Sequence, residues 1–126
     1  MVFKEDIDMR DYINDNIGKY LEKSGDSLNE FKDTLSYTKF LAGFNDDGQI
    51  YGWIQYSINN RVFYVITAYT ENKSKSIFRL KEWEEIKNIA KKEKCKTIRM
   101  MTKRDPKPFK RLYKLKTIQT IMELEL

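Results

Sequence analysis

The sequence contains no histidine, a single cysteine, two prolines and no glycine after Gly52. The absence of histidine excludes the Ser-His and Cys-His nucleophilic pairs and removes the commonest metal ligand. The single cysteine, Cys95, cannot form an internal disulfide, which favours a reducing compartment. Because no histidine is present to activate it, we interpret Cys95 as a small apolar residue of the core rather than as a nucleophile.

Long apolar runs are also missing. No segment approaches the roughly 20 apolar residues of a membrane-spanning helix. The first residues, Met-Val-Phe-Lys-Glu-Asp, place charges where a signal peptide needs an apolar stretch. The 126 residues are 40% hydrophobic and 34% charged. These values predict one ordered, soluble domain over residues 1–126, in the cytoplasm and without a membrane partner.

The net charge of +5 is unevenly distributed along the chain. Residues 1–50 carry 6 basic and 11 acidic side chains, whereas residues 51–126 carry 18 basic and 8 acidic ones. A basic second half is compatible with an anionic ligand, cofactor phosphates or nucleic acid, and equally with a lysine-rich solvated surface. Lysine greatly outnumbers arginine, which argues against specific phosphate or base recognition.

The first third of the chain has helical signals. Apolar residues at helical spacing predict a helix over residues 4–23, and Gly25 is a stop signal. Ser27 and Glu30 have the spacing of a capping box, which predicts a second helix from Ser27 to about Leu35.

Three strands of a meander follow, over residues 39–45, 49–58 and 61–70. The sequence Asp46-Asp-Gly48 predicts the first hairpin turn, and Asn59-Asn60 predicts the second. Gly52 lies inside the second strand, which indicates a bulge or a close backbone approach.

The segment 61–101 predicts a parallel strand–helix–strand unit. Its apolar stripe consists of Ile77, Leu80, Trp83, Ile86, Ile89 and Ala90. This helix ends at Lys94 and leads into a strand over residues 95–101, and a crossover of this length makes the two strands parallel. The polar loop before the helix therefore lies at the carboxyl end of a strand, where such sheets bind ligands. A helix up to about Leu115 and a terminal strand over residues 116–126 complete the prediction.

One passage of this unit resembles a known family. The residues Ala90-Lys-Lys-Glu-Lys-Cys-Lys-Thr-Ile-Arg99 are similar to the helix end and fifth strand of the GNAT acyltransferases, which often read A-K-x-x-G-C-K-x-I-R. The order of the predicted elements also matches that family. The resemblance covers residues 39–126 and implies an α/β fold of GNAT type, an antiparallel meander followed by a parallel β-α-β unit.

The resemblance also implies a cofactor loop. GNAT enzymes hold the coenzyme A pyrophosphate on the backbone of an Arg/Gln-x-x-Gly-x-Gly/Ala loop, which here corresponds to residues 74–79. Ile77 and Arg79 occupy its two glycine positions. The remaining candidates for holding the cofactor are polar or basic: Asn72, Lys73, Ser74, Lys75, Ser76 and Arg79.

Two residues are candidates for catalysis if the protein is an enzyme. Tyr113 is at the place of the tyrosine that many GNAT members use as the general acid toward the coenzyme A thiolate. The Gly-Phe pair that usually closes that helix is absent here. Glu71, at the end of the strand over residues 61–70, is the nearest carboxylate to the expected cleft and a candidate general base.

Three functions follow from these patterns. The eroded loop favours a non-catalytic GNAT-like protein without a cofactor, acting through contacts with other proteins. In its small size and its lack of loop glycines, the chain resembles small bacteriophage GNAT-like proteins, some of which serve in the virion or its assembly. The first alternative is an N-acetyltransferase that uses acetyl-CoA and an amine. The second is non-specific nucleic-acid binding through a basic and aromatic segment. That segment contains Lys103, Arg104, Lys107, Phe109, Lys110, Arg111, Tyr113, Lys114 and Lys116.

Overall fold

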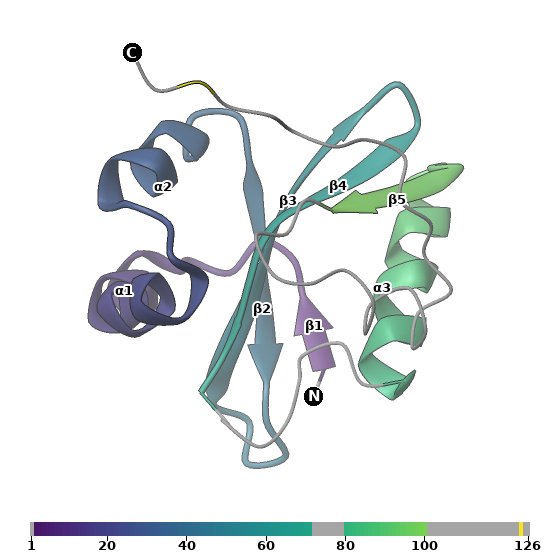
Figure 1. The fold of residues 1–126 in the computed structure, drawn as a ribbon. Helices are drawn as coiled ribbons and strands as arrows, with labels where there is room; N and C mark the ends of the chain where they lie inside the picture. The colour runs from purple at the N-terminus through teal and green to yellow at the C-terminus, as the bar shows by residue number, and fades with distance from the viewer. Residues whose placement is uncertain (1, 72–79, 101–123, 125–126) are drawn as a thin grey trace.

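The computed structural model describes residues 2–71, 80–100 and 124. The elements are β1 (Val2–Lys4), α1 (Arg10–Ser24), α2 (Leu28–Thr34), β2 (Lys39–Phe44), β3 (Ile50–Asn59), β4 (Val62–Thr70), α3 (Leu80–Lys92) and β5 (Thr97–Met100). They form a mixed α/β sheet of order β1-β2-β3-β4-β5, antiparallel as far as β4 and parallel between β4 and β5. Helices α1 and α2 cover one face and α3 covers the other (Figure 1). The predicted meander and parallel β-α-β unit are confirmed.

The predicted first helix is wrong at its start. Val2–Lys4 forms the short strand β1, which pairs with β2, and α1 begins only at Arg10. The Phe3 N–H donates to Glu85 Oε1 at 2.7 Å, and the Phe3 ring is buried. Glu85 is 82 positions from Phe3 in the sequence. A strand of three residues is also too short to show a periodicity from which it could be predicted.

The predicted turns and caps are present, except that the second turn is one residue later than predicted, at Asn60-Arg61 instead of Asn59-Asn60. Gly25 ends α1 with φ +76°, and its N–H bonds the Leu21 carbonyl at 3.1 Å. Gly48 turns the first hairpin with φ +76°. In the second hairpin, Asn60 and Arg61 both have positive φ, as a two-residue loop of type I′ requires.

The capping box of α2 gives a first prediction. The Glu30 N–H donates to Ser27 Oγ at 3.1 Å, and the Ser27 N–H donates to Glu30 Oε1 at 3.3 Å. Replacing Ser27 by alanine removes one of these bonds, and we expect the free energy of unfolding to fall by about 1 kcal/mol. Urea unfolding measures the change. Ser36→Ala, at another exposed serine, is the control, and an equal loss in both variants would contradict the cap.

The face under α1 and α2 is built around Trp53. The buried members of this cluster are Met9, Tyr20, Phe31, Ala42, Trp53 and Tyr69. Trp53 lies 4.7 Å from the Tyr69 ring and 5.7 Å from the Tyr20 ring, measured between centroids. This aromatic packing connects α1 and α2 to the centre of the sheet.

A buried polar network crosses the same face. Gln55 is fully buried, and its amide donates to the hydroxyls of Thr34 and Thr38 at 2.6 and 2.8 Å. Thr67 donates to Gln55 Oε1 at 2.7 Å and accepts from Trp53 Nε1 at 3.0 Å. Because each of these groups has a partner, the network fixes the end of α2 against β3 and β4.

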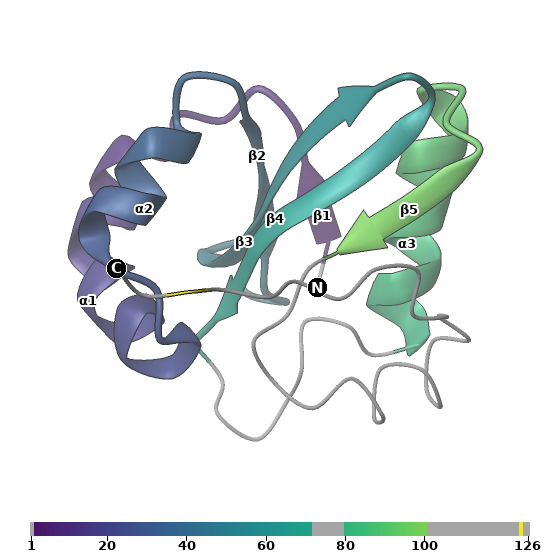
Figure 2. The ribbon, with the colours of Figure 1, turned by 45° about the horizontal axis from the view of Figure 1, so that its top comes forward.

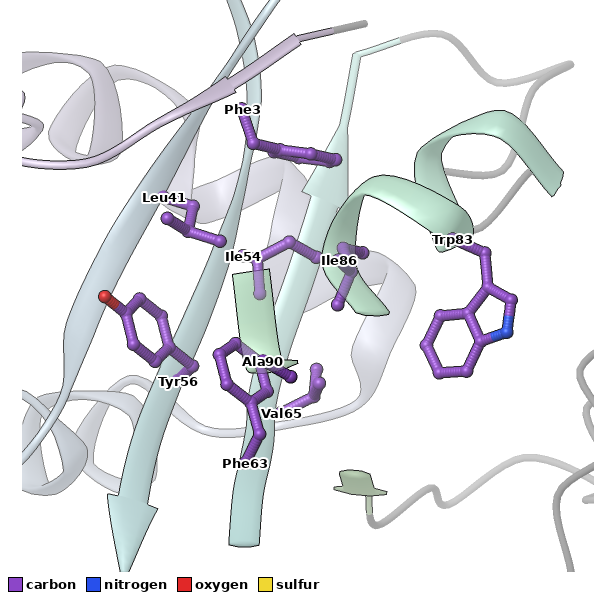
Figure 3. Packing of buried hydrophobic residues seen from close by; sticks show 9 residues of the cluster. All are labelled: Phe3, Leu41, Ile54, Tyr56, Phe63, Val65, Trp83, Ile86 and Ala90. Carbon is purple, nitrogen blue, oxygen red and sulfur yellow. The ribbon is translucent and has the colours of Figure 1, made fainter. Parts of the chain in front are cut away.

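The other face packs against α3. Its buried members are Phe3, Leu41, Ile54, Tyr56, Phe63, Val65, Trp83, Ile86 and Ala90 (Figure 3). The α3 stripe predicted from the sequence is confirmed at Trp83, Ile86 and Ala90, which are buried, and at Ile89, which packs against the cluster.

The chain turns sharply between α3 and β5. Lys94 has φ +61°, a conformation that favours glycine, and it occupies the glycine position of the GNAT passage. The predicted terminal helix lies outside the described residues, as does the predicted terminal strand apart from Leu124, which is in neither a helix nor a strand.

Candidate active site

Strand β4 contains a bulge near the middle of its length. Gln55 pairs with Thr67, but the next residue, Tyr56, pairs with Val65, so Ile66 is an extra residue in β4. The described parallel ladder with β5 runs from Val62–Thr97 to Val65–Met100, and it stops where the bulge begins. Beyond this point β4 continues to Thr70 (Figure 2). The carboxyl end of β4 therefore extends past the described end of β5.

Glu71 follows directly at this end of β4 and is exposed. Its N–H donates to the Tyr51 carbonyl at 3.0 Å, which extends the pairing with β3. Its carboxylate accepts a hydrogen bond from the Tyr12 hydroxyl, with Oε2 at 2.9 Å. Among residues 2–71 and 80–100, Oε1 has no hydrogen-bond partner. Within these ranges, one carboxylate oxygen thus accepts a hydrogen bond and the other accepts none.

Helix α1 supplies the side chains around Glu71. The Asn16 amide donates to the Tyr12 carbonyl at 2.9 Å, and Asn16 Oδ1 accepts from the Tyr69 hydroxyl at 3.4 Å. The Lys23 ammonium lies 3.4 Å from the Thr70 carbonyl and 5.4 Å from the centroid of the Tyr69 ring. These contacts fix the carboxyl end of β4 against α1.

The two tyrosines of this site keep their protons well into the alkaline range. Burial raises the pKa of Tyr12, and the hydrogen bond to the Glu71 carboxylate and its charge raise it further. Burial raises the pKa of Tyr69, again with a contribution from the charge of Glu71. At neutral pH both hydroxyls are therefore hydrogen-bond donors.

These shifts predict loss of stability in alkali. Tyrosines of the unfolded chain lose their protons near pH 10, whereas Tyr12 and Tyr69 keep theirs in the folded chain. Above about pH 10 the unfolded state therefore binds fewer protons, so the free energy of unfolding falls as the pH rises. Urea unfolding at several pH values measures this fall. Tyr12→Phe makes it shallower, and an unchanged slope in that variant would contradict the assignment.

A close backbone approach joins β3 to this end of β4. A Cβ atom on Gly52 would lie 2.1 Å from the Tyr69 carbonyl oxygen and 3.1 Å from Thr70 Cα. Real Cβ atoms do not approach backbone this closely. The prediction of a close approach at Gly52 is confirmed, and this approach lies at the end of β4 that precedes Glu71.

The structure places only part of the predicted site. Glu71 is at the carboxyl end of β4, as predicted. Asn72, Lys73, Ser74, Lys75, Ser76, Arg79 and Tyr113 lie outside the described residues. Cys95 is half-buried against the core, and burial, followed by the charge of Glu93, raises the pKa of its thiol. This agrees with a packing role for Cys95.

Sequence reasoning missed the α1 side of the site. The apolar stripe of the predicted first helix includes Tyr12, and neither Asn16 nor Lys23 is a predicted site residue. The available signal was Asn16, a polar residue inside that stripe and four residues after Tyr12, which puts both on one helix face. Across the described ranges, no group of acidic or cysteine side chains is arranged to hold a metal ion. No helix in those ranges is long and apolar enough to cross a membrane.

Comparisons with known proteins give the fold. No protein-family model matches the sequence. A search of curated proteins also gives no match. Solved structures do match. A probable acetyltransferase has 14% identity and a TM-score of 0.67, with 100% of this chain and 97% of the other covered. A provisionally assigned acetyl transferase from Pyrococcus furiosus has 17% identity and a TM-score of 0.66, with coverages of 99% and 100%.

A third solved structure contains a cofactor. It is an aminoglycoside N-acetyltransferase in complex with CoA, with 9% identity, a TM-score of 0.59 and 99% of both chains covered. At these identities the comparison shows the fold alone. The chain has a GNAT-like acetyltransferase fold, as the sequence resemblance implied.

Proposed function

On the basis of this GNAT-like fold, we propose that the protein transfers an acetyl group from acetyl-CoA to an amine. The observation that carries the proposal is the Glu71 carboxylate at the carboxyl end of β4. It is exposed, fixed through Oε2 by the Tyr12 hydroxyl, and located where strand–helix units bind ligands. An exposed carboxylate in a fixed orientation is suited to accept a proton from an ammonium group.

We expect coenzyme A to bind at the carboxyl end of β4. Past the bulge, β4 uses one backbone edge to pair with β3 over Thr67–Thr70. No described strand pairs with the opposite edge over residues 67–69, whose N–H and C=O groups are of the kind that an extended amide chain can pair with. In the sequence, Lys73, Lys75 and Arg79 fall between β4 and α3, and we expect them to supply positive charge for the phosphates. The bound cofactor would supply an acetyl group activated as a thioester.

Glu71 would perform the proton transfer on the amine side. An ammonium group must lose a proton before its nitrogen can form the new N–C bond, and Oε1 of Glu71 would accept that proton. The Tyr12 O–H bond to Oε2 holds the carboxylate in position, so Tyr12 is a positioning residue. The nitrogen would lose its second proton as the N–C bond forms and the C–S bond breaks, and the thiolate would gain one, so that the products are the amide, the coenzyme A thiol and the proton held by Glu71. The resemblance assigns the protonation of the thiolate to Tyr113, which remains a prediction.

A transfer assay tests the proposal. The protein is incubated with acetyl-CoA and a panel of primary amines that includes aminoglycosides, alkyl diamines and lysine peptides. Release of the coenzyme A thiol is followed, and the acetylated amine is identified by mass spectrometry. We expect at least one amine to be acetylated at a rate proportional to protein concentration. Thiol release without any acetylated amine would contradict an N-acetyltransferase.

A second candidate is a GNAT-fold protein without catalysis that acts through contacts with other proteins. Two observations favour it. The chain has no glycine after Gly52, so the loop over residues 72–79 lacks the glycines that let phosphates approach the backbone. Glu82, which is buried, already places a carboxylate in the first turn of α3, where a phosphate would bind. Failure to bind acetyl-CoA would support this candidate.

Two further predictions come from the sequence alone. The basic residues of the segment 103–116 lie outside the described ranges, so nucleic-acid binding remains a prediction. A role in a bacteriophage virion or its assembly likewise depends only on the resemblance to small phage proteins.

A further inference from the structure

A cavity lies at the end of the sheet opposite the candidate active site. Its volume is about 310 Å³. Its walls come from the residues after β1, the start of β2, the end of β3 and the residue that follows the last turn of α3. Tyr56 pairs with Val65, and from Val65 to Glu71 the strand rises by roughly 20 Å. The cavity is therefore separate from the candidate active site.

Tyr56 supplies a polar group to this cavity. Its side chain is 5% exposed and stacks on Phe63, with 4.8 Å between ring centroids and 7° between planes. Figure 3 shows its hydroxyl directed away from the rest of the cluster, and Tyr56 lines the cavity. In the described portion of the chain the hydroxyl has no hydrogen-bond partner. Among the described residues no buried side-chain oxygen or nitrogen lacks a partner, so the Tyr56 hydroxyl is reached by solvent and is open to a ligand in the cavity.

The charges around the cavity are mainly negative. Glu5 and Asp6, which follow β1, and Glu93, which follows α3, line it together with one cation, Lys39. Burial and then the charges of Glu5, Glu93 and Asp6 raise the pKa of Tyr56 to about 12. The Tyr56 hydroxyl is therefore neutral under ordinary conditions and can accept a hydrogen bond. The described carboxylates are not grouped closely enough to chelate a metal ion, which leaves an organic cation as the matching ligand.

We propose that this cavity binds a small organic cation with a primary ammonium group. The ammonium N–H groups donate to the Tyr56 hydroxyl and to the carboxylates that line the same cavity. The volume is at the lower end of the range for small-molecule sites. The acidic residues come from two separate segments, one after β1 and one after α3. A molecule with two ammonium groups is therefore a better match than one with a single group. The proposal does not depend on acetyl transfer.

Titration by NMR with 1,4-diaminobutane tests the site. We expect saturable shifts at the amides of Ser57, Ile58 and Glu93, which weaken as salt is raised. 1,4-Butanediol should cause no shift, and tetramethylammonium, which has no N–H donor, should bind at least tenfold more weakly. A titration with Nα-acetyl-lysine amide distinguishes two sources of the ammonium group, a free diamine and a lysine side chain of another protein. If the natural ligand is a lysine side chain, Nα-acetyl-lysine amide should bind at least as tightly as 1,4-diaminobutane.

Variants locate the interaction. Tyr56→Phe keeps the stacking on Phe63 and removes only the hydroxyl, and we expect binding to weaken about tenfold. Glu93→Gln should weaken it several-fold and reduce the salt dependence. Glu22→Gln, the same charge change at an exposed position of α1, should leave binding unchanged. No saturable shift at 20 millimolar diamine, an undiminished affinity in Tyr56→Phe, or shifts confined to the Glu71 end of the sheet would each overturn the proposal.

Discussion

Replacing Glu71 by glutamine is expected to lower kcat/KM for acetyl transfer by a hundredfold or more, while the fold is retained. Glutamine has the same shape and can still accept the Tyr12 hydrogen bond at its carbonyl oxygen, but it cannot take a proton from an ammonium group at neutral pH. General-base catalysis typically contributes 10²–10⁴-fold, which sets the size of the loss. Steady-state kinetics on the amine identified in the transfer assay measure it.

Two companion variants separate catalysis from structure. Glu84→Gln removes an exposed carboxylate from α3, where Glu84 pairs with Lys87, and should leave kcat/KM unchanged. Tyr12→Phe leaves the base in place but removes its hydrogen bond, so it should lower kcat by less than Glu71→Gln does and change KM little. Full activity in Glu71→Gln, with activity equally unchanged in Glu84→Gln, would exclude Glu71 as the base.

Replacing Gly52 by alanine is expected to reduce the free energy of unfolding by about 3 kcal/mol. The new Cβ would lie 2.1 Å from the Tyr69 carbonyl oxygen, and the contacting atoms are backbone, which cannot move without separating β3 from β4. For a chain of this length such a change lowers the melting temperature by roughly 10 °C. Urea and thermal unfolding measure it.

The sequence offers a matched control for this substitution. Gly18 is exposed on α1, and a Cβ added there meets nothing within 4 Å. Gly18→Ala should therefore raise stability by about 0.5–1 kcal/mol, because alanine is the better helix former. The same chemical change is thus expected to have opposite signs at the two positions. Equal effects at Gly18 and Gly52 would contradict the close strand contact.

The elements that were predicted correctly have local causes. The Ser27 capping box, the Gly25 stop, the hairpin at Gly48 and the stripe of α3 each depend on residues within one or two turns of each other. Strand β1 has no such cause. It exists because Phe3 is buried against α3 and its backbone bonds Glu85, 82 positions away. Local sequence patterns do not predict a contact between residues so far apart in the sequence.

The same distinction applies to the sites. Glu71 was predictable because it follows a strand that leads into a helix, and the ends of such strands are identifiable from the sequence. Its partner Tyr12 is 59 positions away, and the sequence shows only that this tyrosine belongs to a helix stripe. The cavity at Tyr56 is less predictable still, since four separate segments form its walls.

Calorimetric titration with acetyl-CoA at low salt tests the proposed function most directly, with desulfo-coenzyme A as a control for the thioester end. We expect micromolar binding that weakens sharply in Lys75→Glu, because that change replaces a positive charge of the predicted phosphate loop by a negative one. Absence of heat and of thermal stabilisation at millimolar acetyl-CoA would contradict it. The fold would then be retained without its cofactor, and the function would lie in the proteins that its surface contacts.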